Sequence, residues 1–243
     1  MQINCFTYRF LLISVFISLL LTGCSSISQR QTQSVSYPLE DQHMVNPAWR
    51  SCFFKIYWPE ESDLKFELDL LLAHQIVAPV LKQYGDSLYR WRFHRRANRD
   101  DAGHQFSFIF YSGSDVAAQI SQKINQSRIK QRLIAENILE TTGCTSADDA
   151  KQKHIEDTSD KSWPESVQRH WPTYIMGVSM TWLSLLEDVV PQSVNDEMDI
   201  DSMIAAYGDA EDQVNELWTE YGQHAFLHHL NAVFGYESLL IRY

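Results

Sequence analysis

Residues 88–111 have the sequence LYRWRFHRRANRDDAGHQFSFIFY, and this stretch decides the fold. In its first half, aromatic side chains at positions 89, 91 and 93 alternate with basic ones at 90, 92 and 94. In its second half, Phe106, Phe108 and Phe110 share one side. A period of two is that of a strand with one buried face. Since Asn98 and Gly103 bound a turn-rich segment between the halves, the stretch predicts a β-hairpin.

The flanking segments alternate between strand and helix patterns. Residues 53–58 are aromatic and β-branched, and Pro59 ends this predicted strand. Apolar residues follow at helical spacing over 64–80, with Ser62 as the candidate N-cap, and again over 114–124. Residues 128–139 fit either a helix or a fourth strand. If they form a strand, the order is βαββαβ, a ferredoxin-like layout.

The rest of the chain predicts helices. Helical patterns cover residues 163–171, 173–190 and 209–234. The predicted fold class is therefore α+β, with the ferredoxin-like half packed with a mostly helical C-terminal half. The predicted divisions are a signal peptide over 1–23, a flexible tether over 24–47, an α+β subdomain over 48–144, a polar linker over 145–162 and a mostly helical subdomain over 163–243.

The N-terminus has the order of a secretory signal. Arg9 precedes an apolar run over residues 10–21, and small and polar residues follow. A membrane-spanning helix needs about 20 apolar residues, so this run is too short to cross a bilayer. An ordinary cleaved signal, with Cys24 incidental, is the nearer alternative.

The residues Leu21-Thr22-Gly23-Cys24 resemble the lipobox of bacterial lipoproteins. The resemblance implies cleavage before Cys24, a diacylglyceryl group on its sulfur, and usually a third acyl chain on the new amino terminus. Two or three chains anchor a protein firmly where one does not. Ser25, a residue other than aspartate after the cysteine, implies passage to the outer membrane, so we expect the mature chain on its periplasmic face.

The charge balance excludes several partners. The chain has 20 basic and 31 acidic side chains. Cleavage would remove Arg9 and leave a formal charge of −12. A surface this acidic argues against binding to nucleic acid and against electrostatic docking on anionic lipid headgroups. We therefore expect the lipid anchor to provide the contact with the membrane.

Cysteine usage predicts a disulfide. Cys5 would leave with the signal and Cys24 would carry lipid, so Cys52 and Cys144 remain as a pair in an oxidising compartment. The alternative is two reduced, buried thiols that pack as small hydrophobes.

Two clusters could bind ligands. His224 and His228 are spaced to face one metal ion, zinc being the candidate, although a third ligand is not evident and both could instead pack near a helix end. Arg90, Arg92, His94 and Arg96 lie in the one dense basic region and could hold an anion such as a lipid phosphate or a cell-wall carboxylate. The alternative pairs these arginines with acids such as Asp100 and Asp101.

Residues 53–111 also resemble the start of the elimination domain of lanthipeptide and thiopeptide dehydratases. The resemblance rests on Lys55-Ile56-Tyr57, Asp69-Leu70-Leu71, Pro79 and Trp91-Arg92-Phe93-His94. That family works in the cytosol on tRNA-activated peptides, whereas the signal here predicts export. It therefore transfers no site residue to this chain.

The predicted function is that of a membrane-anchored envelope lipoprotein. The mature chain has no Gly-x-Ser-x-Gly, no Cys-x-x-Cys and no phosphate-binding glycine loop. We therefore expect a non-enzymatic binding or accessory module that faces the periplasm, uses no cofactor and binds an envelope protein. The alternative is a metal-dependent envelope hydrolase that uses His224 and His228.

Overall fold

The computed structural model describes residues 44–146 and 150–237. Cys24, the predicted signal and most of the predicted tether lie outside the described residues. The last predicted tether residues are held to the domain, because the Val45 carbonyl accepts a hydrogen bond from the Ser114 N–H at 2.8 Å.

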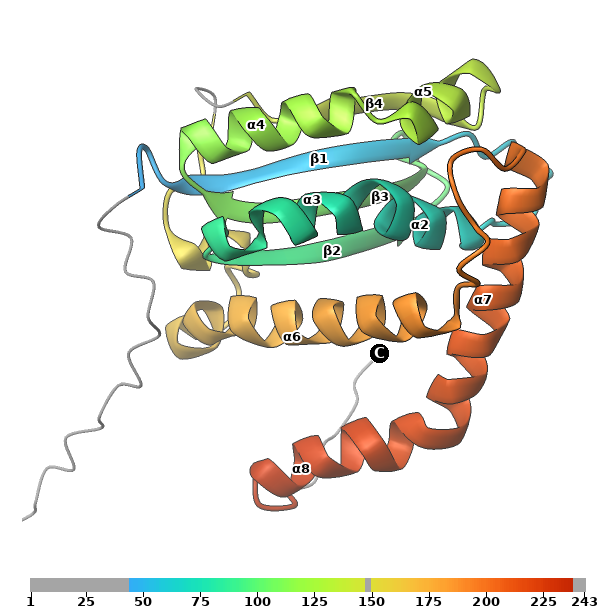
Figure 1. The fold of residues 1–243 in the computed structure, drawn as a ribbon. Coiled ribbons are helices and arrows are strands. Elements are labelled where there is room, and N and C mark those ends of the chain that lie inside the picture. The colour runs from blue at the N-terminus through green and yellow to red at the C-terminus, as the bar shows by residue number, and fades with distance from the viewer. Residues whose placement is uncertain (1–43, 147–149, 238–243) are drawn as a thin grey trace, which may run out of the picture. The chain divides into compact units, whose positions relative to one another are not determined.

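The centre of the fold is a four-stranded antiparallel sheet in the order β2-β3-β1-β4 (Figure 1). Its strands are β1 (Ala48–Ile56), β2 (Arg90–Ala97), β3 (His104–Ser112) and β4 (Leu139–Cys144). The hairpin predicted from residues 88–111 is therefore present as β2 and β3.

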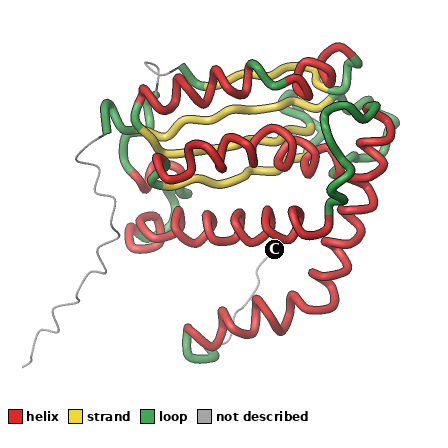
Figure 2. The backbone as a smooth tube through the Cα atoms, viewed as in Figure 1, coloured by secondary structure: helices red, strands yellow, loops and turns green. Residues whose placement is uncertain are grey.

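Helices lie on one face of this sheet, as Figure 2 shows. The first crossover contains α2 (Glu67–Leu71), a π-helical turn η2 (Leu72–Val77) and α3 (Ala78–Tyr84), followed by the short 3-10 turn η3 (Gly85–Ser87). The second contains α4 (Ser114–Asn125) and α5 (Arg128–Ala135). Residues 128–139 thus form a helix that leads into β4. The βαββαβ order and the α+β class are confirmed.

The first crossover begins later than the sequence predicts. Ser62 is not an N-cap, because its hydroxyl donates to the Pro59 carbonyl at 2.8 Å and so closes a turn instead. The helix begins at Glu67, and the Phe66 side chain before it forms no cap. A serine that bonds its own local backbone in a turn competes with helix initiation, which explains the shift.

The core lies between the sheet and these helices. Phe54, Phe106 and Phe108 have 0% exposure and meet leucines from the first crossover, such as Leu71. The predicted disulfide is present: Cys52 on the central strand β1 is bonded to Cys144 on the edge strand β4. It joins positions 92 residues apart in the sequence.

The C-terminal half contains two long helices. The helix α6 (Glu165–Val189) lies beside the edge strand β2, and the Phe93 N–H donates to Ser179 Oγ of α6 at 3.1 Å. Such cover protects a sheet edge from pairing with another chain. Next comes α7 (Ile200–Gly222), which continues into the π-helical turn η5 (Gln223–His228) and then α8 (His229–Val233) (Figure 1).

Pro172 does not divide α6, although the sequence predicts separate helices on either side of it. A proline lacks the N–H that would bond the carbonyl four residues earlier, here that of Gln168. The buried Ser159 hydroxyl donates to the Gln168 carbonyl at 2.6 Å and replaces that bond. The helix is therefore continuous.

Residues 200–222 are helical from an earlier point than the sequence predicts. The Asp199 side chain accepts the Ser202 N–H at 2.9 Å and caps α7, which begins at Ile200, nine residues before the predicted start. Across residues 44–146 and 150–237, no helix is both long and apolar enough to span a membrane.

Candidate functional site

The face of the sheet opposite the helices is partly covered by residues 150–159. The Trp49 N–H donates to the Gln152 carbonyl at 2.8 Å, and Trp49 Nε1 donates to the Ile155 carbonyl at 2.9 Å. The Tyr111 hydroxyl donates to the Lys153 carbonyl at 2.8 Å. These bonds hold the described part of the polar stretch, with its short 3-10 helix η4 (Ile155–Thr158), against the sheet.

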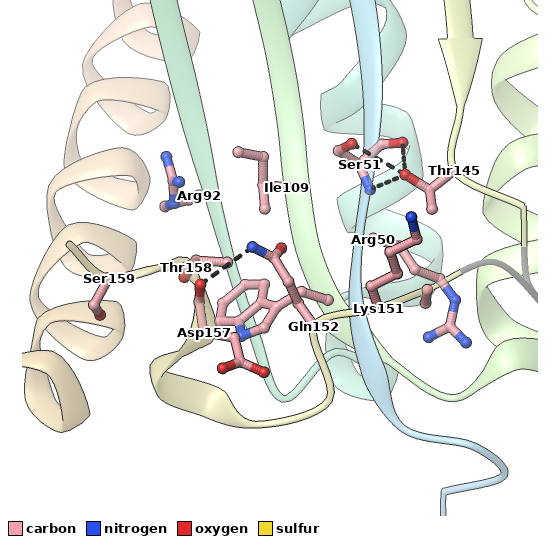
Figure 3. Close-up of a pocket in the computed structure, with 12 residues that line it drawn as sticks. Arg50, Ser51, Arg92, Ile109, Thr145, Lys151, Gln152, Asp157, Thr158 and Ser159 are labelled. Atoms are coloured by element: carbon pink, nitrogen blue, oxygen red, sulfur yellow. Dashed lines mark hydrogen bonds between the residues drawn. The ribbon is translucent and has the colours of Figure 1, made fainter. Parts of the chain in front are cut away.

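A cavity of about 650 Å³ lies between this segment and the sheet (Figure 3). Strands supply one wall, and residues 150–152 and 157–159 supply the other. Its lining consists of Trp49, Arg50, Ser51, Arg92, Ile109, Thr145, Ala150, Lys151, Gln152, Asp157, Thr158 and Ser159. The volume is within the range of small-molecule sites.

Arg92 is the unusual residue of this cavity. Its Nε is buried and has no hydrogen-bond partner, and no carboxylate in the described part of the chain pairs with its guanidinium. The guanidinium carbon lies 5.0 Å from the centre of the Trp171 ring. Burial lowers the pKa of Arg92 to about 10. A desolvated cation without a counter-ion is costly for a protein to hold, and a bound anion would relieve that cost.

The remaining charges leave the cavity positive. Arg50 and Lys151 add two further cations to the lining. Burial alone would raise the pKa of Asp157, but hydrogen bonds from the His154 N–H and Lys161 outweigh it and lower the pKa. The Asp157 charge is thus already balanced by Lys161 at 3.1 Å. Thr158 Oγ1 is buried without a hydrogen-bond partner and supplies a neutral donor.

The disulfide fixes one side of the cavity. Ser51 and Thr145 are the neighbours in sequence of Cys52 and Cys144, and their hydroxyl oxygens lie 3.2 Å apart. Figure 3 shows the bonds that join the two residues. No imidazole is among the described lining residues, whose titratable side chains are those of Arg50, Arg92, Lys151 and Asp157.

The other members of the predicted anion-binding group lie on the same strand. Arg90 Nε donates to Thr173 Oγ1 at 3.1 Å, and Arg96 pairs with Asp100 at the hairpin turn. His94 is largely exposed to solvent. The partial desolvation of its ring, followed by the charges of Arg92 and Arg96, lowers the pKa of His94, so the ring is neutral near pH 7. Arg92 is the member of this group that lines the cavity.

Comparisons with known proteins give no family. No protein-family model matches the sequence, and no curated protein matches it. The crystal structure of TsrL is similar over 73% of this chain, with 11% identity and a TM-score of 0.36. This chain spans about half the length of TsrL, at 49%. A similarity this distant carries no argument about function. The two resemblances noted in the sequence stay predictions.

The predicted metal ligands lie far along the chain, on η5. The exposed imidazoles of His224 and His228 stack with their ring centres 5.2 Å apart, and His229 meets His224 edge-on. Within the described ranges, no group of three or more His, Cys, Asp or Glu side chains is arranged to hold a metal ion. A zinc site on His224 and His228 stays a prediction that rests on these two rings.

A buried ionic network escaped the sequence analysis. Asp69 of α2 has 0% exposure, and it accepts hydrogen bonds from His104 Nε2 at 3.0 Å and Arg95 Nε at 2.8 Å. Arg95 also lies 3.8 Å from Glu211 of α7. The sequence does place Asp69 among the apolar residues of a predicted helix, and a buried carboxylate requires partners, so a network at this position could have been predicted. The network joins α2, β2, β3 and α7.

Proposed function

We propose that this chain is a lipid-anchored envelope protein whose folded part is a non-enzymatic binding module. We further propose that the Arg92 cavity is its binding site for an anionic group. One observation carries the binding role: Arg92 is a half-buried guanidinium that lines a cavity and has no carboxylate partner in the described chain.

The export and anchoring part is supported by residues and chemistry. The lipobox-like residues Leu21-Thr22-Gly23-Cys24 predict lipid on Cys24 and a periplasm-facing position, most simply on the outer membrane. The Cys52–Cys144 disulfide suits an oxidising compartment. With the lipid supplying the membrane contact, the domain is left to bind an envelope partner that carries phosphate or carboxylate groups.

The anchor has a direct test. A Cys24→Ser protein should lose its acyl label and accumulate as an unprocessed precursor, because the sulfur that accepts the lipid is gone. Metabolic labelling with a radioactive fatty acid, followed by gel electrophoresis, measures both effects. A Cys24→Ser protein that is still cut and still found in the membrane fraction would show that no lipoprotein signal operates.

The binding site is tested by titration calorimetry of the full-length protein with inorganic phosphate and, separately, with acetate. An Arg92→Gln change should weaken binding of the preferred anion by about tenfold or more, since a charge-assisted bond is lost. Arg96→Gln is the matched control: it lies on the same strand but already pairs with Asp100. Equal affinities of wild type and Arg92→Gln for both anions would refute the site.

The same titration has a pH dependence with a definite sign. The pKa of Arg92 is lowered to about 10, so the guanidinium is charged below that pH and neutral above it. Acetate stays fully ionised over this range, so we expect its affinity to be constant from pH 7 to about 9 and to fall as pH rises through about 10. A decline between pH 6 and 8 would instead implicate a histidine.

A further inference from the structure

An apolar groove of about 580 Å³ lies between α6 and the α7–η5–α8 segment. It is separate from the Arg92 cavity and shares no lining residue with it. Figure 1 shows α7 connecting α6 to α8, with α8 turning back below α6. The side chains that matter here are Tyr174, Val178, Trp182, Trp218, Phe226 and Leu227.

Exposed apolar side chains are concentrated in the part of the chain that forms most of the groove. Of the thirteen large apolar side chains that are exposed in the described residues, ten lie between positions 167 and 236. Trp218 is 53% exposed and Leu227 is 51% exposed, although both line the groove. Proteins rarely leave such side chains clustered on their surface unless the cluster binds something.

The segment that forms most of the groove is rich in acidic residues. Residues 165–237 contain thirteen Asp and Glu side chains and a single Lys or Arg, Arg169. The cation that lines the groove, Arg95, is already bonded to Asp69 at 2.8 Å and lies 3.8 Å from Glu211. The segment that forms most of the groove therefore carries a large net negative charge.

The aromatic wall is formed before any partner arrives. The Trp218 ring stacks on Phe226, with ring centres 5.9 Å apart and planes 14° apart. A Cβ added at Gly222 would lie 2.9 Å from the Trp218 ring, so the absence of a side chain there lets the indole lie against the helix. A partner would need little reordering of these rings to bind, which favours affinity.

We propose that this groove binds an amphipathic helix with an apolar face and basic flanks, supplied by a partner protein. A helix in an apolar groove is a common recognition mode, in which side chains at helical spacing fill the groove. Basic flanks complement the acidic surroundings. A membrane of anionic lipid and a second copy of this acidic chain would both meet repulsion at the same surface.

The test uses the full-length protein and a fluorescent peptide of about 18 residues that contains leucines at helical spacing and lysines elsewhere. Fluorescence anisotropy should show binding that weakens as salt is added, because the attraction between the charges is screened. A Val178→Lys change should reduce affinity by about tenfold or more, since it places a charged ammonium group in the apolar groove.

The chain contains a well-matched control. Val167 lies on the same helix and is 45% exposed, against 44% for Val178, but it does not line the groove. Val167→Lys makes the same change in charge and should leave affinity near that of the wild type. Equal losses in the two variants would show that net charge alone governs binding and would overturn the groove.

Three further outcomes would overturn the proposal. The first is that a peptide with glutamate in place of every lysine binds as tightly as the lysine peptide, which would show that the groove does not require a basic partner. The second is tighter binding to vesicles of anionic phosphatidylglycerol than to the peptide. The third is a wild-type dimer, seen by sedimentation and lost in Val178→Lys, that excludes the peptide. These results are independent of the Arg92 titration, so the two proposals can fail separately.

Discussion

Individual residues show where sequence patterns succeed and where they stop. The alternation of Trp91 and Phe93 with basic neighbours correctly predicted a strand with one buried face. Asp69 gave no such pattern, because its partners Arg95 and His104 are 26 and 35 residues away and meet it only in the folded chain. Among the predicted basic residues, nothing in the sequence distinguished Arg92 from its neighbours, since its special environment comes from residues 150–159.

Removing the Asp69 carboxylate should strongly destabilise the protein. In Asp69→Ala, His104 and Arg95 lose their shared acceptor, and Arg95 is left partly buried beside fewer negative charges. We expect the free energy of unfolding to fall by about 3–5 kcal/mol, as for other broken buried ion pairs. Urea denaturation followed by tryptophan fluorescence measures it. Asp101→Ala in the hairpin turn is the control and should change little; similar losses in both would contradict a specific role for the network.

At the scale of elements, the predictions were best for segments with a clear period. The hairpin and α4 follow period-two and helical patterns, and both were found where expected. Residues 128–139 contain parts of two elements, which explains why neither pattern fitted them alone. The predicted break in the helix at Pro172 was wrong because the group that replaces the missing N–H, the Ser159 hydroxyl, comes from outside the helix.

The Ser159–Pro172 relation predicts a coupling between two substitutions. Ser159→Ala should lower the free energy of unfolding by about 1–3 kcal/mol, because it leaves the partly buried Gln168 carbonyl without this donor. In a Pro172→Ala background, the new N–H at position 172 can bond that carbonyl, so the same Ser159→Ala change should be clearly less damaging. Unfolding curves of the four proteins give the coupling energy. Additive effects would mean that the hydroxyl does not substitute for the proline.

At the scale of the whole molecule, the order of elements predicted the sheet but not the packing of the C-terminal helices. Their position depends on side-chain bonds between distant elements, such as His74 Nδ1 with the Tyr207 hydroxyl at 2.6 Å. Tyr207 of α7 has 0% exposure, and burial raises its pKa, with a weaker opposing effect from Gln75. Neither the residue types nor their spacing in the sequence predicts that His74 and Tyr207 will form a hydrogen bond.

Loss of the disulfide should lower the free energy of unfolding of the whole domain. In the chain-entropy account, a bond that joins positions 92 apart restricts the unfolded chain by roughly 4–5 kcal/mol. A Cys52→Ala/Cys144→Ala protein should therefore unfold at a lower urea concentration than the wild type. Adding reductant should destabilise the wild type to a similar extent and leave the variant unchanged. An effect of reductant on the variant would locate the sensitivity elsewhere.

The central position of β1 has a consequence for folding kinetics. Among the described strands this one is synthesised first, yet its partners are β3, where Ala48 faces Ser112, and β4, where Cys52 faces Cys144. Both neighbours must leave the ribosome or translocation channel before β1 can be paired on each side. Contacts this distant in sequence slow folding, because a large loop must close before they form. The first strand of the described residues is thus the last to have both of its neighbours in place, and a holding chaperone would have its greatest effect there.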